Sequence, residues 1–200
     1  NYSSPSNAYL VIIGDVNYDE IKSKVTDLFG SWNSKEVSSS SFPSPNNPDE
    51  TEIIFVDMPN GVQSVVSVIN TVEFNKKNSD YFAALVANRI LGGGGAGRLF
   101  NNLREDKGWT YGSYSGISES YKTKGLVIAQ AQVRNEVTDS AAVELLMELD
   151  KMKNTFVLDE ELNSAKAKYT GNFVLSLENP STIAGFARNI ITQDLPEDYY

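Results

Sequence analysis

The segment from Arg98 to Gly112 reads RLFNNLREDKGWTYG and is the most informative stretch of the sequence. Leu99 and Leu103 stand one helical turn apart, which predicts a short helix that buries both of them. Arg104 falls near the end of this helix, where the helix dipole favours a cation. Taken by themselves, these residues indicate a capping charge at Arg104 and a strand aromatic at Tyr111.

A run of glycines comes directly before this segment. Gly92, Gly94 and Gly97 formally satisfy the pattern G-x-G-x-x-G, but an amphipathic helix precedes them where a dinucleotide site needs a strand. A phosphate loop needs Lys and then Ser or Thr after the glycine, and Arg98 follows here. Two interpretations stay open: a plain joint between two helices, or a mobile loop that contacts a peptide.

Outward from these glycines, hydrophobic periodicity predicts an α+β fold. Short connections between strands favour a largely antiparallel sheet, and we expect the helices to pack on one face of it. Residues 1–200 are expected to form a single domain, as a piece of a longer chain, with a surface linker at 33–49. Strands are predicted at 8–16, 52–57, 63–71, 110–119 and 125–134, and helices at 17–29, 78–91, 98–106, 138–152, 159–176 and 180–193.

The composition excludes several kinds of function. The 200 residues include no histidine and no cysteine, which removes the usual ligands of catalytic zinc and the usual partners of a Ser or Cys nucleophile. We therefore expect no metal and no cofactor on this chain. The net charge of −9 disfavours nucleic acid as a partner, and no apolar run is long enough to span a membrane.

The order R-L-F-x-x-L-R-E-x-x-G-x-x-Y at 98–111 resembles the signature of the C-terminal domains of insulinase/pitrilysin-type zinc peptidases. The non-catalytic subunit of mitochondrial processing peptidase has the same signature. The strand that ends at Gly14-Asp15 and the helix that ends at Gly30 occur in the same order in that family. The resemblance covers nearly the whole chain and implies the α+β domain that these peptidases repeat.

In this family a catalytic domain carries zinc on an inverted H-x-x-E-H motif, which this chain lacks. The resemblance therefore implies a non-catalytic domain that holds peptide substrate, with zinc in a catalytic domain of the same polypeptide or of a partner subunit. It implies that Arg104 and Tyr111 contact the substrate, and that Gly93, Gly94 and Gly95 form a loop that handles it. The alternative is an inactive scaffold or interaction domain without a role in proteolysis.

Acidic residues of the predicted helix 138–152 have a simpler interpretation. Asp139, Glu144, Glu148 and Asp150 are expected to form a solvated face. An independent enzyme based on carboxylate or Ser-Lys chemistry is disfavoured, because no such residues group together. The sequence leaves the compartment open between the bacterial periplasm and the cytoplasm.

Overall fold

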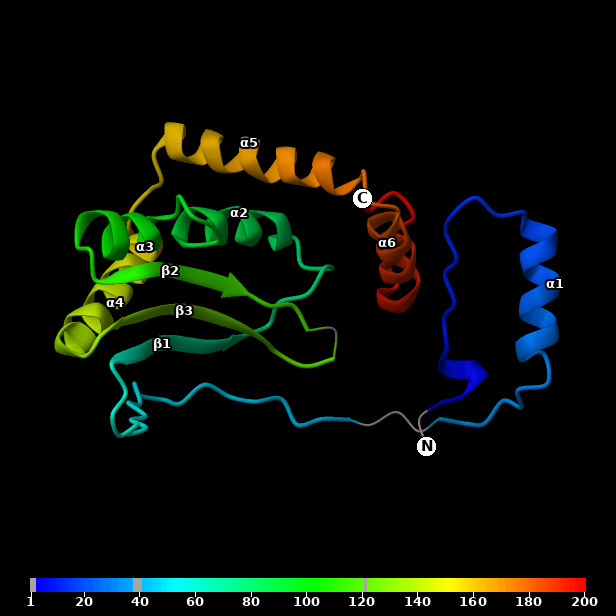
Figure 1. Ribbon diagram of the computed structural model, residues 1–200, viewed down its shortest axis with the longest axis horizontal. Coiled ribbons are helices and arrows are strands. Elements are labelled where there is room, and N and C mark those ends of the chain that lie inside the picture. Colours follow the sequence, from blue (N-terminus) through cyan, green and yellow to red (C-terminus); the bar gives the residue numbers. More distant parts are fainter. Residues whose placement is uncertain (1–2, 38–40, 121) are drawn as a thin grey trace. The chain divides into compact units, whose positions relative to one another are not determined.

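A computed structural model describes residues 3–37, 41–120 and 122–200 (Figure 1). The chain divides into two compact units. The larger unit, Pro43–Gly171, contains the sheet and the segment from Arg98 to Gly112. The smaller unit combines Asn1–Phe42 with Asn172–Tyr200.

The sheet of the larger unit has three strands in the order β1-β3-β2. They are β1 (Gln63–Val72), β2 (Thr110–Ile117) and β3 (Gly125–Arg134). Both outer strands pair with β3 in antiparallel fashion. These strands coincide with three predicted ones, and the antiparallel sheet is confirmed.

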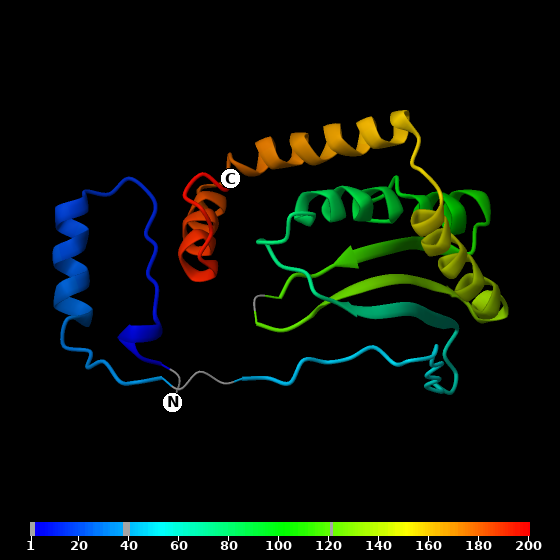
Figure 2. The same cartoon turned by 180° about the vertical axis from the view of Figure 1, so that it is seen from behind.

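Four helical segments accompany the sheet, which Figures 1 and 2 show from opposite sides. Along β3, Ala129, Ala131 and Val133 are buried while the alternate residues are exposed, so a single face carries the core. Leu99, Leu103 and Leu145 complete that core from the helices. The α+β class with helices on one face is confirmed, and the segments are α2 (Tyr81–Leu91), α3 (Arg98–Phe100), the π-helix η2 (Asn101–Asp106) and α4 (Thr138–Asn154).

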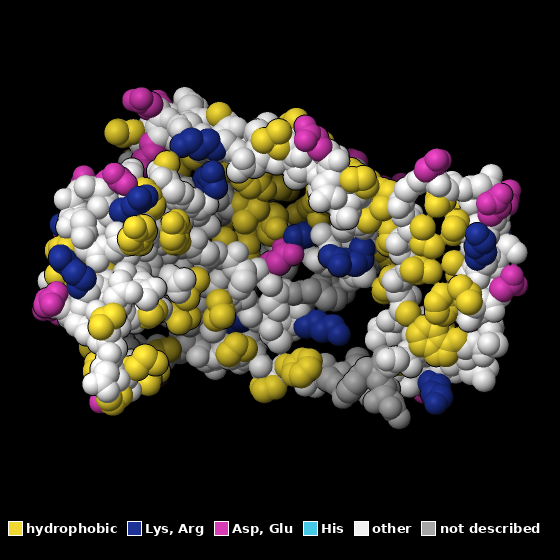
Figure 3. Space-filling view, viewed as in Figure 1, with side chains coloured by type: hydrophobic (Ala, Val, Ile, Leu, Met, Phe, Trp, Pro, Cys, Tyr) yellow, Lys and Arg dark blue, Asp and Glu magenta, His cyan; other side chains and the backbone are white. Residues whose placement is uncertain are grey.

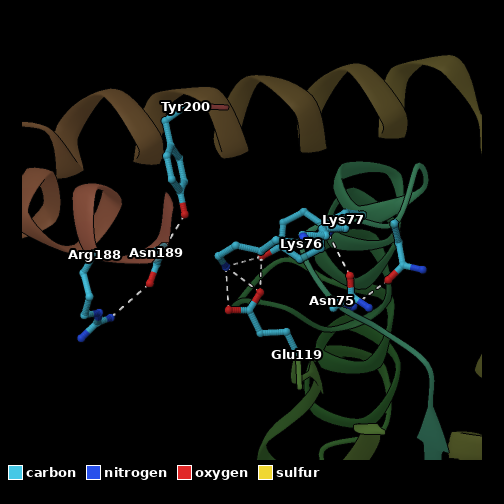
Figure 4. Close-up of polar contacts among 9 residues, drawn as sticks. Asn75, Lys76, Lys77, Glu119, Arg188, Asn189 and Tyr200 are labelled. Atoms are coloured by element: carbon cyan, nitrogen blue, oxygen red, sulfur yellow. Dashed lines mark hydrogen bonds and ion pairs between the residues drawn. The ribbon is translucent and has the colours of Figure 1, made fainter. Parts of the chain in front are cut away.

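A small polar cluster ties the start of α2 to the chain that follows β2. The ammonium of Lys76 donates to both carboxylate oxygens of Glu119 and to the hydroxyl of Tyr81, at 2.5–3.0 Å (Figure 4). The ring of Tyr81 stacks on Phe74 with centroids 4.9 Å apart. The cluster therefore holds the segment before α2 against the segment after β2.

The remaining helices also lie where the sequence predicts them. They are α1 (Tyr18–Phe29), α5 (Asp159–Ser176) and α6 (Pro180–Gln193), with 3-10 turns η1 (Pro5–Asn7) and η3 (Asn135–Val137). Asn17 caps α1, because its side chain accepts from the backbone N–H groups of Asp19 and Glu20. No helix within the described residues is both long and apolar enough to cross a bilayer.

Two predicted strands are wrong for this structure. Residues 8–16 and 52–57 run without regular secondary structure, and their apolar side chains remain exposed: Leu10 by 60% and Ile53 by 92%. An apolar run becomes a strand only when a second strand supplies hydrogen bonds to its backbone. Figure 3 shows the hydrophobic side chains that gather over α1 and the segment before it.

Candidate functional site

The glycine run connects α2 to α3 and approaches other backbone closely at both ends. A Cβ on Gly92 would lie 2.6 Å from the backbone nitrogen of Ser115, and that nitrogen donates to the Gly92 carbonyl at 2.9 Å. A Cβ on Gly97 would lie 2.7 Å from the Cα of Gly92. These two glycines are therefore required by packing against β2 and against each other.

The three glycines predicted to handle substrate lie between these two, in the middle of the loop. Arg89 of α2 donates from Nη1 to the carbonyl of Gly93 at 2.7 Å and so holds this part of the loop. A Cβ on Gly94 would meet the same guanidinium at 2.8 Å, whereas a Cβ on Gly95 would meet nothing within 4 Å. Gly95 is thus the member of the run that faces open space.

Arg104 lies on the π-helix η2 with 42% of its side chain exposed. Its guanidinium sits over the ring of buried Phe100, with 4.7 Å from Cζ to the ring centroid. The nearest acidic partner is its neighbour Glu105, at 3.7 Å from Nε. The Phe100 ring therefore packs against one face of the guanidinium, and the rest of the guanidinium remains open to solvent.

Tyr111 is 91% exposed, whereas Ser113, two residues further along β2, is fully buried. Residues two apart on a regular strand point to the same face. A β-bulge explains the difference: Thr110 pairs with Val133 and Ser113 with Ala131, so two residues of β2 stand opposite one residue of β3. The extra residue turns Tyr111 away from the core.

The side chain of Thr110 stabilises this bulge. Its hydroxyl lies 2.6 Å from the carbonyl oxygen of Gln132, the β3 residue opposite the bulge. The hydroxyl oxygen of Thr110 also accepts from the backbone N–H of Gly112 at 3.1 Å. Thr110 therefore replaces hydrogen bonds that the bulge removes from the strand pair.

The structure places Arg104 and Tyr111 on adjacent elements, because η2 packs against β2. No direct contact between the two side chains occurs among the described interactions. The Phe100 ring under Arg104 stands 6.1 Å from the ring of Tyr114, a residue of the same strand as Tyr111. Both predicted residues are therefore exposed, on two elements that pack against each other.

A polar network that the sequence does not predict connects η2 to α4. The side-chain amide of Asn102 donates to Glu144 at 2.9 Å and to Glu148 at 2.8 Å. Lys107 pairs with Glu144 at 3.0 Å and Lys151 with Glu148 at 2.8 Å. The hydrogen bond from Asn102, aided by Lys107, holds the pKa of Glu144 below its ordinary value.

The expectation of a solvated acidic face is therefore wrong for two of its four residues. Glu148 is only 5% exposed and faces η2, and Glu144 shares the amide of Asn102. An amphipathic pattern does not reveal that a buried carboxylate will find a donor on another helix. The Oδ1 atom of Asn102 is itself buried without a hydrogen-bond partner in the described part of the chain.

A second tie joins α3 to α5. Arg98 donates from Nε and Nη2 to the two carboxylate oxygens of Glu161, at 2.8 and 2.6 Å. This bidentate hydrogen bonding raises the pKa of Arg98 above its ordinary value. The segment that carries Arg104 is thus fastened at Arg98 to α5 and at Asn102 to α4.

The arrangement of the side chains shows whether this site could hold a metal ion. Among the described residues, no group of three or more His, Cys, Asp or Glu side chains is placed to hold a metal ion. The paired carboxylates Glu144 and Glu148 are already engaged by an amide and by two lysines. The donor set of this site does not fit zinc, which prefers nitrogen and sulfur ligands with an open position.

Residues 1–169 match the family model described as "Peptidase M16 inactive domain". The chain belongs to this family. A zinc protease of Bacillus subtilis (strain 168) is 32% identical over 105 residues, which are 52% of this chain and 25% of that protein. One of Rickettsia felis (strain ATCC VR-1525 / URRWXCal2) is 29% identical over 174 residues, 86% of this chain and 40% of that protein.

Solved structures share the fold of this M16 domain. The M16 inactive domain of Pseudomonas fluorescens superimposes with a TM-score of 0.79 at 23% identity, over 93% of this chain and 43% of that one. A protease of Helicobacter pylori gives 0.78 at 20% identity, over 91% and 44%. The chain therefore spans less than half the length of these relatives, and the family assignment confirms the resemblance seen in the sequence.

Proposed function

We propose that this M16 inactive domain holds peptide substrate for a zinc-dependent catalytic domain, in the same polypeptide or in a partner subunit. The relatives of this chain in the M16 family are named zinc proteases, which supports a zinc ion in the catalytic domain. Arg104 and Tyr111 are the residues proposed to contact the substrate. The glycines 93–95 are proposed to form the wall of the substrate path beside them.

One observation carries the proposal: two side chains that offer hydrogen-bond donors, Arg104 and Tyr111, are exposed on elements that pack against each other. An exposed tyrosine at a bulge and an arginine over an aromatic ring do not contribute to the core described above. A guanidinium offers a permanent charge and several donors, and a phenol offers one more. Both suit a peptide carbonyl on which negative charge develops during hydrolysis.

The proposal can be tested by peptide cleavage with the protein and its catalytic domain together. We expect Arg104→Ala and Tyr111→Phe each to lower kcat/KM by about 10- to 100-fold, because each removes a donor near the reacting carbonyl. Arg188→Ala and Tyr18→Phe serve as matched controls, since both residues are exposed and belong to the smaller unit. Wild-type rates in both test variants would contradict the substrate-holding role.

The alternative is a scaffold that supports the catalytic domain without touching substrate. The extensive exposure of apolar side chains in residues 8–16 and 52–57 favours a surface that is covered by other protein. A scaffold predicts that Arg104→Ala leaves cleavage unchanged while apolar substitutions in these segments weaken assembly. The same cleavage assay, combined with a measurement of assembly, separates the two functions.

A further inference from the structure

A hollow of about 90 Å³ lies between the glycine run and α5, within the larger unit. Its lining includes Gly94 and Gly97 from the loop, Arg89 from α2, and Glu161, Ser164 and Lys168 from α5. A single water needs about 10–15 Å³ of such space. The hollow is therefore large enough for a side chain or a chain end of several heavy atoms.

The charges around this hollow are unequal. Arg89 and Lys168 contribute two positive charges to its lining, and Glu161 contributes one negative charge. Both oxygens of that carboxylate already accept from Arg98, at 2.8 and 2.6 Å. Because Arg98 compensates Glu161, the hollow is locally cationic in a chain whose net charge is −9.

Arg89 is also held in a fixed place. Its Nη1 donates to the carbonyl of Gly93 at 2.7 Å, and its guanidinium lies close enough to Gly94 that a Cβ there would stand 2.8 Å from Nη1. A guanidinium has five N–H donors, and the contact with Gly93 uses one. The remaining fork is oriented by the loop before any ligand arrives, which lowers the entropic cost of binding.

We propose that this hollow binds a carboxylate of the peptide substrate, between Arg89 and Lys168. The ligand is an Asp or Glu side chain or the C-terminal carboxylate of a peptide. The inference rests on the proposed function, and it adds a preference for acidic peptides to a domain that is itself acidic.

The test uses the protein with its catalytic domain depleted of zinc, so that peptides bind without being cleaved. Fluorescence anisotropy gives the Kd for a peptide series in which Glu replaces Gln at one position at a time, each with a free or an amidated C-terminus. We expect at least one acidic form to bind about 3- to 10-fold more tightly than its neutral counterpart. The Glu series and the free C-terminus series distinguish the two sources of carboxylate.

Substitutions in the lining of the hollow test whether the preference for acidic peptides arises there. Lys168→Gln is expected to reduce the acidic-to-neutral affinity ratio to about one, while the affinity for neutral peptides stays unchanged. Arg89→Gln is expected to reduce the same ratio to about one. Lys166→Gln is the matched control, because it lies on the same helix outside the hollow. Lys168 makes no described contact with the loop, so its variant tests the charge without disturbing the Gly93 carbonyl.

The outcomes separate the inference from the function on which it rests. A wild-type protein without preference at any position, or a preference that survives both Lys168→Gln and Arg89→Gln, would overturn the carboxylate site. In either case, Arg104→Ala would still weaken the binding of acidic and neutral peptides alike if the domain holds substrate. A protein that binds none of the peptides would overturn both.

Discussion

At the scale of single residues, the glycines of the run 92–97 differ in how closely other atoms approach them. Gly92 and Gly97 are confined by neighbouring backbone, whereas a Cβ on Gly95 would meet nothing within 4 Å. No glycine of this run has a φ in the left-handed region. Close approach, rather than backbone conformation, therefore explains why glycine is needed at the ends.

This difference predicts opposite results for two alanine substitutions. Gly92→Ala is expected to lower the free energy of unfolding by about 1–3 kcal/mol, because its Cβ would overlap the backbone of Ser115. Gly95→Ala is expected to change it by less than about 0.5 kcal/mol. Urea unfolding followed by circular dichroism measures both, and equal losses would contradict this account of the loop.

Single residues also mark the limit of sequence-based prediction at the site. The spacing of Arg104 and Tyr111 in a recognised signature was enough to select them, and the structure exposes both. The bulge that turns Tyr111 outward could not be predicted, because it depends on how β2 aligns with β3. The hydroxyl of Thr110 shows its role only after that pairing is known.

At the scale of elements, the position of Arg104 depends on the network between η2 and α4. The Asn102 side chain links this π-helix to Glu144 and Glu148, and Glu148 is almost fully buried. Segments of π-helix are rare and often occur at functional sites. The network provides a physical reason for η2 to keep one position while its exposed residue reaches outward.

Removing the amide of Asn102 should therefore cost stability. Asn102→Ala is expected to lower the free energy of unfolding by about 1–3 kcal/mol, because the buried carboxylate of Glu148 loses a donor. Asn101→Ala is the matched control, since Asn101 is exposed on the same π-helix. Denaturant titrations of the two variants compare them directly, and equal stability would argue against the network.

The same network predicts a pH dependence. Because the pKa of Glu144 is lowered in the folded state, its contribution to stability is present above the ordinary Glu value of about 4.3 and is lost as the pH falls through the folded value. Glu144→Gln lacks this contribution. The stability difference between wild type and variant should therefore be largest near neutral pH and should shrink below about pH 4.

Unfolding curves measured across this pH range check the prediction. Lys107→Gln provides a second comparison, because it removes the ammonium that lies 3.0 Å from Glu144 and leaves the carboxylate itself in place. In this variant, the loss of stability on acidification should begin at a higher pH than in wild type. A difference between wild type and Glu144→Gln that does not vary with pH would contradict the lowered pKa.

Periodicity predicted most elements because their partners lie within the same unit. The strands at 63–72 and 125–134 pair with each other, and α4 covers the face that they share. The apolar runs 8–16 and 52–57 carry an equally strong pattern, yet they form no strand here. A pattern of apolar residues reports the tendency to be buried, and it does not report which chain supplies the partner.

At the scale of the whole molecule, the chain supplies only part of what its relatives contain. It spans less than half the length of the two zinc proteases and of the two solved structures named above. Its sequence has no histidine or cysteine, and its family is described as an inactive domain. The proposed role of Arg104 and Tyr111 therefore requires a second domain that brings the metal.

Peptide binding, measured separately from cleavage, tests this role most directly. The protein is combined with its catalytic domain after zinc removal, and the Kd of a fluorescent peptide is determined for wild type, Arg104→Ala, Tyr111→Phe and the double variant. The account predicts that each single change weakens binding by about 3- to 10-fold and that the double variant binds more weakly than either. Unchanged Kd values in all three variants, with assembly intact, would contradict it.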